Sequence, residues 1–382
     1  MSAFRIAVRR FAAFESAIRK QWDAFEDAAH SGLTLEVTPL DLDPLHRAIF
    51  DSNDAWDVVF MNTDWVAEAA DSSALLDIGP YLSSDPPEGY PGGWSDSLMR
   101  FQQVDRRVLG LPYHDGPECL IYRRDLFEHA DIPVPATWEA FHAAARRFTD
   151  PARNLWGSVF AAYPDGHNMV YDFCLQLWTR GGSLDALESG AAVEAVRFYR
   201  EILRDQAAVH PGCAGFDSVK SGYAFAAGEV ALMVNWFGFA AMSETILESK
   251  VRGKVGVAAI PASGGPHVSL NVYWLLAIGA GCARPATAWS FLRHCATPAM
   301  DKLLTLEGAI GCRKSTWMDA DVNRAIPFYG AMEELHREAR ELPRTRNWAS
   351  IAKAIDGMMA AAIQTDRPET ELLADLAKEI TL

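Results

Sequence analysis

The sequence predicts an α/β protein whose domains are built on doubly wound sheets. The first sixty residues alternate between strand and helix patterns in the order β-α-β-α-β, which is typical of parallel sheets covered by helices. The chain has 382 residues, enough for two or three domains. Hydrophobic residues make up 49% and charged residues 22% of the chain, so it can bury large cores without disulfides or metals.

The N-terminal elements follow from the spacing of apolar residues. Phe4–Val8 alternates as a strand does, and Leu33–Thr38 is the second predicted strand. Pro44–Phe50 predicts a short helix, and the β-branched run Asp57–Met61 predicts a buried third strand. Between the first two strands, a three- and four-residue spacing predicts an amphipathic helix ending near Gly32, with the stripe Phe11, Phe14, Ile18, Trp22 and Phe25.

The remaining elements are placed by the same periodicities. Strands are predicted at Val108–Tyr113, Cys119–Tyr122, Glu229–Asn235, Gly256–Ile260 and Val272–Ile278. Helices are predicted at 124–130, 137–148, 168–179, 191–207, 218–227, 285–296 and 369–378. A long C-terminal helix is indicated by the stripe Trp348, Ile351, Ile355, Met358 and Ala362. Two strands end at a proline, Pro112 and Pro261, where the chain can pass from one domain to another.

Charge and hydropathy exclude several classes of protein. Lys and Arg number 35 and Asp and Glu 50, a net charge of −15, which disfavours nucleic-acid partners and docking on anionic membranes. No apolar run approaches the length of about 18 residues that a membrane-spanning helix needs, so no membrane insertion is expected. An export signal is not expected either, since basic residues interrupt every apolar run near the N-terminus: Arg5, Arg9, Arg10, Arg19 and Lys20.

Catalytic and metal-binding motifs are missing from the sequence. The six cysteines form no CxxC pair, and there is no HExxH, no phosphate-binding loop and no GxSxG elbow, so neither metal nor cofactor is expected. Gly279-Ala280-Gly281 begins a GxG pattern that a tight turn explains as well as a dinucleotide site. His114, Asp115 and Glu118 could form an acid–base pair, but hydrogen bonding to a ligand accounts for them equally.

A set of motifs runs in order along nearly the whole chain. Gly110–Phe127 has the sequence GLPYHDGPECLIYRRDLF and is followed by PVPATWE at Pro133–Glu139. The others are Trp56–Met61, Leu75–Ile78, Phe225–Asn235, Trp289–Leu292 with Thr297–Pro298, and Gly311–Ser315. Together they resemble the family-1 extracellular solute-binding proteins, the sugar receptors of ABC importers akin to maltose-binding protein. The leader peptide and lipid-attachment cysteine of that family are missing, and Gly311–Ser315 lacks the family's proline.

The resemblance implies a two-lobe fold of the periplasmic-binding-protein type II class, with a hinge between doubly wound lobes. We place lobe one at 1–111 plus 261–310 and lobe two at 112–260 plus 311–382, with the ligand cleft between them. The implied function is capture of a carbohydrate or polyol for an ABC permease, without catalysis, by a monomer. The implied location is periplasmic; either a leader has been removed or the protein stays in the cytoplasm, as the six thiols favour.

Sugar binding needs flat aromatic rings and planar hydrogen-bonding groups, and such residues follow several predicted strand ends. The resemblance places these at the ligand: Asp64, Trp65, His114, Asp115, Glu118, Asn235, Trp236, Asn271, Tyr273, Trp274, Arg313 and Trp348. Asn168 and Trp178 are weaker candidates.

Several of the predicted ligand residues could have a structural role instead of contacting a ligand. Trp274 and Trp348 lie in apolar stripes that fit a core, Asp64 precedes a helix that it could cap, and Asp115 could be a turn residue. Two other functions also stay open. The acidic and aromatic residues would suit a cationic ligand such as a polyamine, and a cytoplasmic enzyme or sensor could use His114 as its acid–base group.

Overall fold

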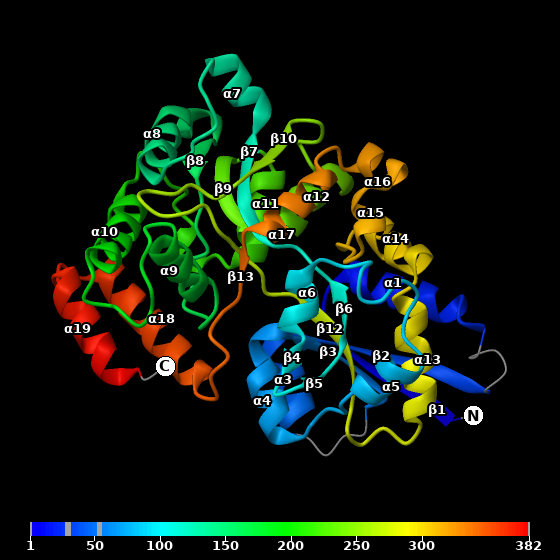
Figure 1. The fold of residues 1–382 in the computed structure, drawn as a ribbon. Helices are drawn as coiled ribbons and strands as arrows, with labels where there is room; N and C mark the ends of the chain where they lie inside the picture. The colour runs from blue at the N-terminus through cyan, green and yellow to red at the C-terminus, as the bar shows by residue number, and fades with distance from the viewer. Residues whose placement is uncertain (1, 27–31, 52–55, 381–382) are drawn as a thin grey trace. The chain divides into compact units, whose positions relative to one another are not determined.

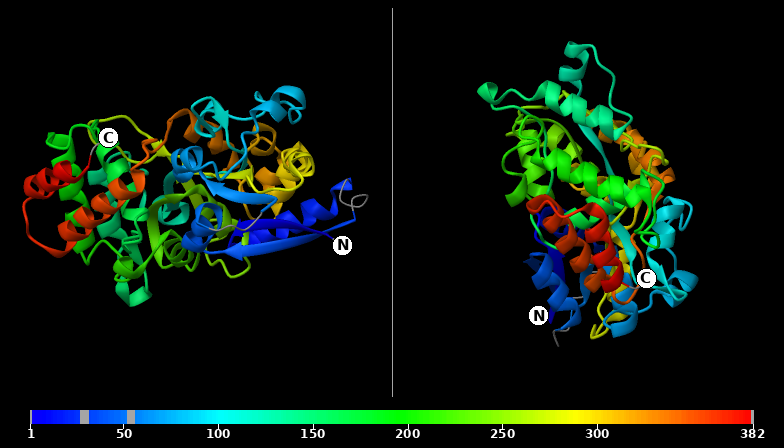
Figure 2. Two further views of the ribbon diagram at one scale, coloured as in Figure 1. Left: turned by 90° about the horizontal axis from the view of Figure 1, so that it is seen from below. Right: turned by 90° about the vertical axis from the view of Figure 1, so that its left-hand side faces the viewer.

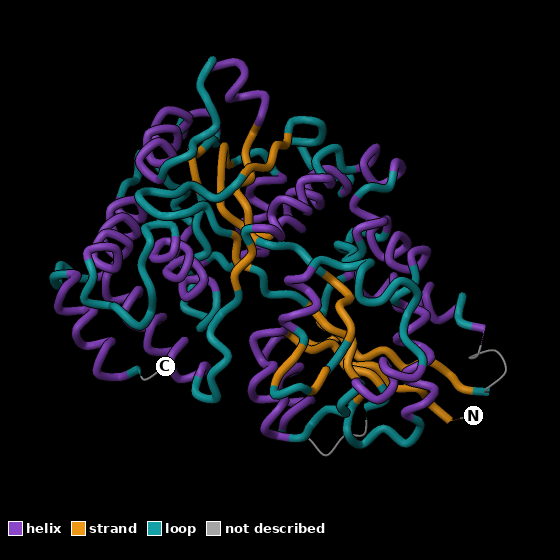
Figure 3. Tube along the Cα trace, in the orientation of Figure 1, coloured by secondary structure: helices purple, strands orange, loops and turns teal. Residues whose placement is uncertain are grey.

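A computed structural model describes residues 2–26, 32–51 and 56–380 (Figure 1). The chain divides into two compact units, each made of separate stretches of sequence. Unit 1 comprises 1–116 and 271–333, and unit 2 comprises 117–270 and 334–382. Within each unit, helices surround a central sheet, as the colouring by secondary structure shows (Figure 3). The predicted α/β class is therefore confirmed.

Unit 1 is built on a five-stranded sheet in the order β2-β1-β3-β12-β6. The first three of these strands are parallel, as the β-α-β-α-β pattern predicts, whereas β12 runs antiparallel to both of its neighbours. The strands are β1 (Ser2–Arg9), β2 (Leu33–Leu40), β3 (Val58–Asn62), β6 (Leu111–His114) and β12 (Trp274–Ile278), with a separate hairpin of β4 (Gln103–Val104) and β5 (Arg107–Val108).

The helices of unit 1 cover this sheet. They are α1 (Ala12–Asp23), α3 (Leu42–Phe50), α4 (Val66–Ser72), α5 (Gly79–Ser84), α6 (Asp96–Phe101), α13 (Pro285–Cys295), α14 (Pro298–Leu306), α15 (Lys314–Trp317) and α16 (Ala320–Ala325). The predicted stripe of α1 is buried and packs aromatic side chains on the sheet; the ring of Trp22, for example, lies 4.8 Å from that of Phe4. α1 ends at Asp23 rather than near Gly32, and residues 27–31 lie outside the described part of the chain.

Unit 2 is built on a four-stranded sheet in the order β10-β7-β9-β8. Its strands are β7 (Glu118–Arg123), β8 (Trp156–Ser158), β9 (Val230–Trp236) and β10 (Val255–Ala258). β7 is antiparallel to both neighbours and only β8 pairs parallel, so this sheet is mixed. A short parallel pair joins β11 (Ser269–Leu270) to β13 (Ala339–Arg340).

The helices of unit 2 include the longest of the described chain. They are α7 (Arg124–Ala130), α8 (Trp138–Phe148), α9 (Asn168–Trp178), α10 (Gly190–Arg204), α11 (Ser218–Ala226), α12 (Phe237–Thr245), α18 (Trp348–Gln364) and α19 (Glu369–Glu379); α17 (Met332–Arg337) spans the passage from unit 1. α18 and α19, orange and red in Figure 2, pack on α10, and α18 also packs on α9. The predicted long C-terminal helix is confirmed, with Trp348 as its first residue.

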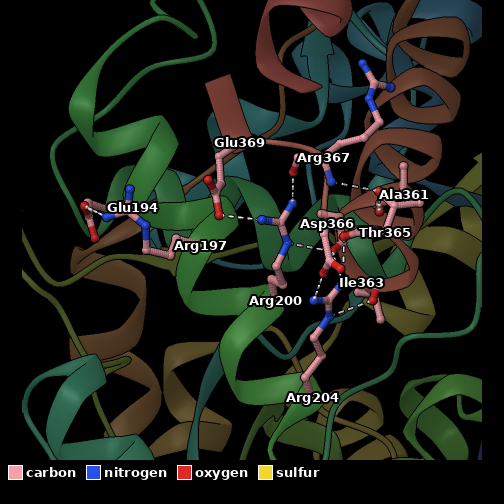
Figure 4. A network of polar contacts seen from close by, with 11 residues as sticks. Glu194, Arg197, Arg200, Arg204, Ala361, Ile363, Thr365, Asp366, Arg367 and Glu369 are labelled. Carbon is pink, nitrogen blue, oxygen red and sulfur yellow. Dashed lines mark hydrogen bonds and ion pairs between the residues drawn. The ribbon is translucent and has the colours of Figure 1, made fainter. Parts of the chain in front are cut away.

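Two arginines of α10 fix the C-terminal helices of unit 2 (Figure 4). Arg200 donates to the carbonyls of Ala362 (2.7 Å) and Arg367 (2.5 Å) and pairs with Glu369 (2.6 Å). Arg204 donates to the carbonyls of Ile363 (3.0 Å) and Thr365 (2.6 Å). The last carbonyls of a helix have no partner within the helix, so these guanidinium groups satisfy the end of α18.

The three boundaries between the units lie later in the chain than the sequence analysis placed them. They fall at 116/117, 270/271 and 333/334 rather than at 111/112, 260/261 and 310/311. β6 stays in unit 1 because it pairs with β12, and β11 stays in unit 2 because it pairs with β13. Residues 311–333 stay in unit 1 because α15 and α16 pack on α14.

In the part of the chain that the structure describes, no helix has both the length and the apolar character that crossing a bilayer requires. All six cysteines lie in described residues and are free; Cys282 is partly exposed and the other five are buried.

Candidate functional site

In unit 1, two of the predicted ligand residues, His114 and Trp274, meet at one edge of the sheet with Asn62, which the sequence analysis did not propose. β3 ends at Asn62, β6 ends at His114, and β12 begins at Trp274. Trp274 is the register partner of Asn62 on one side and of His114 on the other. The sheet therefore places an indole, an amide and an imidazole side by side. We call Asn62, Asp64, His114, Asp115, Asn271 and Trp274 the unit 1 edge.

His114 is held as a neutral hydrogen-bonding group. Its Nδ1 accepts from the backbone N–H of Ile310 at 2.9 Å, so the ring proton is on Nε2, which is a donor. Burial lowers the pKa of His114 to about 4, against the opposing effect of the Asp115 charge. The backbone N–H of Asp115 donates to the carbonyl of Ile310 at 3.0 Å, so both residues are fixed to the same turn.

Asp64 and Asn271 present polar groups at the same edge of unit 1. The short 3₁₀ helix Thr63–Trp65 is capped by Asn62, whose Oδ1 accepts from the Asp64 N–H at 2.9 Å. Asn62 is thus the capping residue that the sequence analysis considered Asp64 to be. Asn271 is only 1% exposed, and neither atom of its side-chain amide has a hydrogen-bond partner among the described residues. Buried amides are ordinarily satisfied, so this one is suited to a bound hydroxyl.

Trp65 packs against the Trp274 ring of this edge. It is buried, and its ring makes perpendicular contacts with Trp274 at 5.9 Å and with His46 at 5.1 Å. Trp274 itself is partly exposed. Of the two rings predicted to stack on a ligand, Trp274 presents the accessible surface and Trp65 holds it in place.

Two predicted ligand residues of unit 1 have structural roles instead. Tyr273 is fully buried in the core, and its hydroxyl donates to the carbonyl of Leu98 at 2.5 Å. The Arg313 guanidinium lies 4.3 Å from the centre of the Trp94 ring and donates to the carbonyls of Ala296 and Glu88 at 2.8 and 2.9 Å. These contacts occupy the Tyr273 hydroxyl and both Nη atoms of Arg313, whose Nε has no hydrogen-bond partner among the described residues, so we remove Tyr273 and Arg313 from the proposed site.

In unit 2, the corresponding edge is formed by the start of β7 and the end of β9. Glu118 opens β7 and is the register partner of Trp236, the last residue of β9. Trp236 is partly exposed and its ring lies 5.6 Å from that of Tyr171, at 80°. Glu118 is 5% exposed, and its Oε2 has no hydrogen-bond partner among the described residues.

The carboxyl of Glu118 lies in an acidic environment that the sequence analysis missed. Burial raises its pKa well above the usual value, and the charge of Asp172 raises it further. Asp172 lies on α9, where its Oδ2 accepts from the Tyr199 hydroxyl at 2.8 Å. Burial raises the pKa of Asp172 to about 7, against the lowering effect of that hydrogen bond. The available signal was that Asp172 is the only charged residue in an otherwise apolar helix.

Asn235 is a structural residue and not a ligand group. Its Nδ2 donates to the carbonyl of Ser218 at 3.0 Å, and its Oδ1 accepts from the N–H of Trp236 at 2.8 Å. The first bond ties the end of β9 to the start of α11, and the second lies in the turn from β9 into α12. Asn168 is likewise used locally, since its Nδ2 donates to Asp165 at 2.5 Å. Trp348 and Trp178 are buried in unit 2, at the start of α18 and the end of α9.

No metal centre accompanies these residues: the described chain holds no group of three or more His, Cys, Asp or Glu side chains placed to bind an ion. What the two edges offer is aromatic surface beside neutral and acidic hydrogen-bonding groups. Such groups bind and orient a small polar molecule, and neither edge pairs a nucleophile with a base.

Comparison with known proteins agrees with this assessment. Residues 8–302 match the family of bacterial extracellular solute-binding proteins, and the chain belongs to that family. A protein of Brucella abortus that is named as a binding protein is 26% identical over 263 residues. That match covers 65% of this chain and 60% of the relative, so this chain aligns with less than two thirds of that relative's length.

Solved structures extend the likeness to the whole fold. Maltose-bound MalE3 of T. maritima has a TM-score of 0.89 at 21% identity, with 99% of each chain covered. An ABC transporter solute-binding protein of Agrobacterium radiobacter K84, in complex with ribitol, has a TM-score of 0.88 at 22% identity, covering 99% of this chain and 98% of that one. The two-lobe fold expected from the sequence is thereby confirmed.

Proposed function

We propose that this protein is a non-catalytic receptor that captures a carbohydrate or polyol and delivers it to the permease of an ABC importer. The observation that carries the proposal is the composition of the two sheet edges. In each unit a partly exposed tryptophan stands beside planar hydrogen-bonding groups, Trp274 between Asn62 and His114, and Trp236 beside Glu118. Rings stack on the C–H faces of a sugar, and amides, imidazoles and carboxyls bind its hydroxyls.

Family membership supports the binding role, and the ligands of the two similar structures support the ligand class. Those proteins hold maltose and ribitol, both rich in hydroxyl groups. We propose that the unit 1 edge and the Glu118–Trp236 edge each supply groups that bind the solute. The periplasm is the compartment in which such a receptor works beside its permease.

Isothermal titration calorimetry with a panel of sugars and polyols tests this function. Maltose, ribitol, mannitol and their monosaccharide relatives should include at least one ligand that binds with a Kd in the micromolar range or tighter. Replacing Trp274 or Trp236 by Ala should weaken that ligand by on the order of 1–3 kcal/mol, about 5- to 150-fold. Tyr223→Ala, which removes an exposed ring of α11, is the matched control and should leave Kd unchanged.

The absence of binding across the whole panel would contradict the proposal. So would turnover of a bound solute that is lost in His114→Ala, because that result would assign His114 an acid–base role.

A further inference from the structure

Two apolar helices of unit 2 each carry one buried or partly buried aspartate. Asp172 is the only charged residue of α9, and Asp356 is the only acidic residue of α18. The two helices pack on each other. An acid in an apolar helix interior is costly unless a partner compensates it, so each of these residues calls for a physical explanation.

Charge effects connect these aspartates to Asp165 and Glu118. Asp165 lies just before α9, and its Oδ1 accepts from the N–H groups of His167 and Asn168 at 2.9 and 3.0 Å. Its charge raises the pKa of both Asp172 and Asp356, adding to the larger effect of burial. Asp172 in turn raises the pKa of Glu118. Four carboxyl groups therefore form one series, which we call the acidic series: Glu118, Asp172, Asp165 and Asp356.

Little positive charge compensates the acidic series. Against the raising effect of burial, the pKa of Asp356 is lowered by a backbone hydrogen bond from Gly166 and by the charge of His167 when protonated, and Tyr199 contributes a neutral hydroxyl to Asp172. Two carboxyl oxygens, Oε2 of Glu118 and Oδ1 of Asp356, are buried without a hydrogen-bond partner among the described residues. Their residues are 5% and 8% exposed. Buried carboxyl oxygens of this kind are ordinarily satisfied by donors, so these two oxygens lack a donor and the series has little positive charge beside it.

Aromatic rings adjoin the same series. Trp236 is the register partner of Glu118, and its ring meets that of Tyr171, the residue before Asp172. The hydroxyl of Tyr171 lies 3.1 Å from Nδ1 of His167. Ring faces next to carboxylates attract organic cations through both charge and the ring quadrupole.

We propose that unit 2 binds a protonated amine of the solute, so that the ligand is a hydroxylated amine such as an amino sugar or amino polyol. This inference rests on the proposed function and names its substrate class. An ammonium group supplies up to three N–H donors and the missing positive charge. A metal ion is a poorer match, since the described residues offer no group of three ligands for one.

The test compares matched pairs of ligands that differ only in the amine. Calorimetry with glucosamine against glucose, and with 1-amino-1-deoxysorbitol against sorbitol, measures the preference directly. We expect the amine of at least one pair to bind at least tenfold more tightly, and the difference to shrink as KCl is raised. Glu118→Gln and Asp172→Asn should reduce the preference to less than threefold. Glu188→Gln removes the same charge from an exposed position of unit 2 and should keep it.

The possible outcomes separate a failure of the amine inference from a failure of the proposed function on which it rests. If the two members of every pair that binds have equal affinity, or if the neutral member binds more tightly, the inference of an amine-binding site is overturned and carbohydrate binding stands. Binding of putrescine or spermidine as tightly as the hydroxylated amines supports the amine and overturns the requirement for hydroxyls. Failure of every ligand to bind overturns the proposed function and the inference together. Thermal melting of the variants verifies that they fold; if Glu118→Gln does not, Asp172→Asn and Asp356→Asn carry the comparison.

Discussion

At the scale of single residues, the sequence predicted positions better than roles. Trp274, His114 and Glu118 lie at strand ends with groups that a ligand can use, as expected. Tyr273, Asn235 and Arg313 were predicted together with them, yet the Tyr273 hydroxyl, the Asn235 amide and the Nη atoms of Arg313 bond to the protein itself. A motif fixes a residue along the chain, but which partner its side chain reaches depends on segments far away in sequence. Arg313 shows this, since its partner Glu88 is 225 residues away.

Asp172 and Asp356 were overlooked for a related reason. Ligand groups are expected in loops after strands, whereas these acids lie inside helices. Their importance comes from the packing of α9 against α18 and from the unusual solvation that results. A lone acid in an apolar helix is a visible sequence signal, but its partners become known only from the structure.

The partly buried imidazole of His114 predicts a pH dependence of stability. Its pKa is about 4 in the folded protein, below the ordinary value of 6.5. Between these values the unfolded chain binds a proton that the folded protein does not, so the free energy of unfolding falls as pH decreases from 6.5 to 4. The loss is up to roughly 3 kcal/mol and is absent above pH 6.5.

Urea unfolding at several pH values tests this prediction. His114→Gln keeps an acceptor for the Ile310 N–H and should show a flatter profile between pH 4 and 6.5. His129→Gln, at an exposed position, should follow the wild type. An unchanged slope in His114→Gln would assign the pH dependence to other groups.

At the scale of elements, the sequence was most informative where burial is complete on both faces. All five residues of β3 are buried, and the β-branched run Asp57–Met61 identified it nearly to its ends. Periodicity also located α18 from its first residue. It could not give the direction of β12 or the mixed pairing in unit 2, because strand direction depends on which distant segments pair.

The hydrogen bonds from the arginines of α10 to the C-terminal helices predict that one side chain of α10 contributes strongly to the free energy of unfolding. Arg200→Ala removes three hydrogen bonds, one of them from a partly buried ion pair with Glu369. We expect the unfolding transition of unit 2 to lose about 2–3 kcal/mol, because the carbonyls and the carboxylate lose their donor.

Arg197→Ala is the matched control, three residues away on the same helix. Arg197 pairs only with exposed Glu194 in the contacts shown in Figure 4, so its removal should cost less than about 0.5 kcal/mol. Thermal melting, with hydrogen exchange to follow α19, measures both. Because alanine has the highest helix propensity, neither change should lose stability on that account, and similar losses in the two variants would contradict a special role for the contacts of Arg200.

At the scale of the whole molecule, the sequence predicted the family and the two-lobe fold because its motifs occur in the family's order. Three passages of the chain between lobes were also expected, and the structure has three boundaries. Their positions were less predictable. Pairing of β6 with β12 and of β11 with β13 decides which unit each segment joins, and short segments carry little pairing information in their own sequence.

A solute shared by both units predicts protection in both. Hydrogen exchange, measured with and without the ligand that calorimetry identifies, should slow at Asn271–Trp274 in unit 1 and at the end of β9 in unit 2. The exposed helix α7 serves as the internal reference and should exchange unchanged. Protection confined to one unit would contradict a ligand held by both edges.

Glu118 and Asn271 both lie close to a boundary along the chain. Glu118 is the second residue after the first boundary, and Asn271 is the first residue after the second boundary. Each side chain is therefore attached to a stretch of backbone that connects the two units. A solute that bonds to either group would restrain that connecting backbone as well as the sheet edge itself.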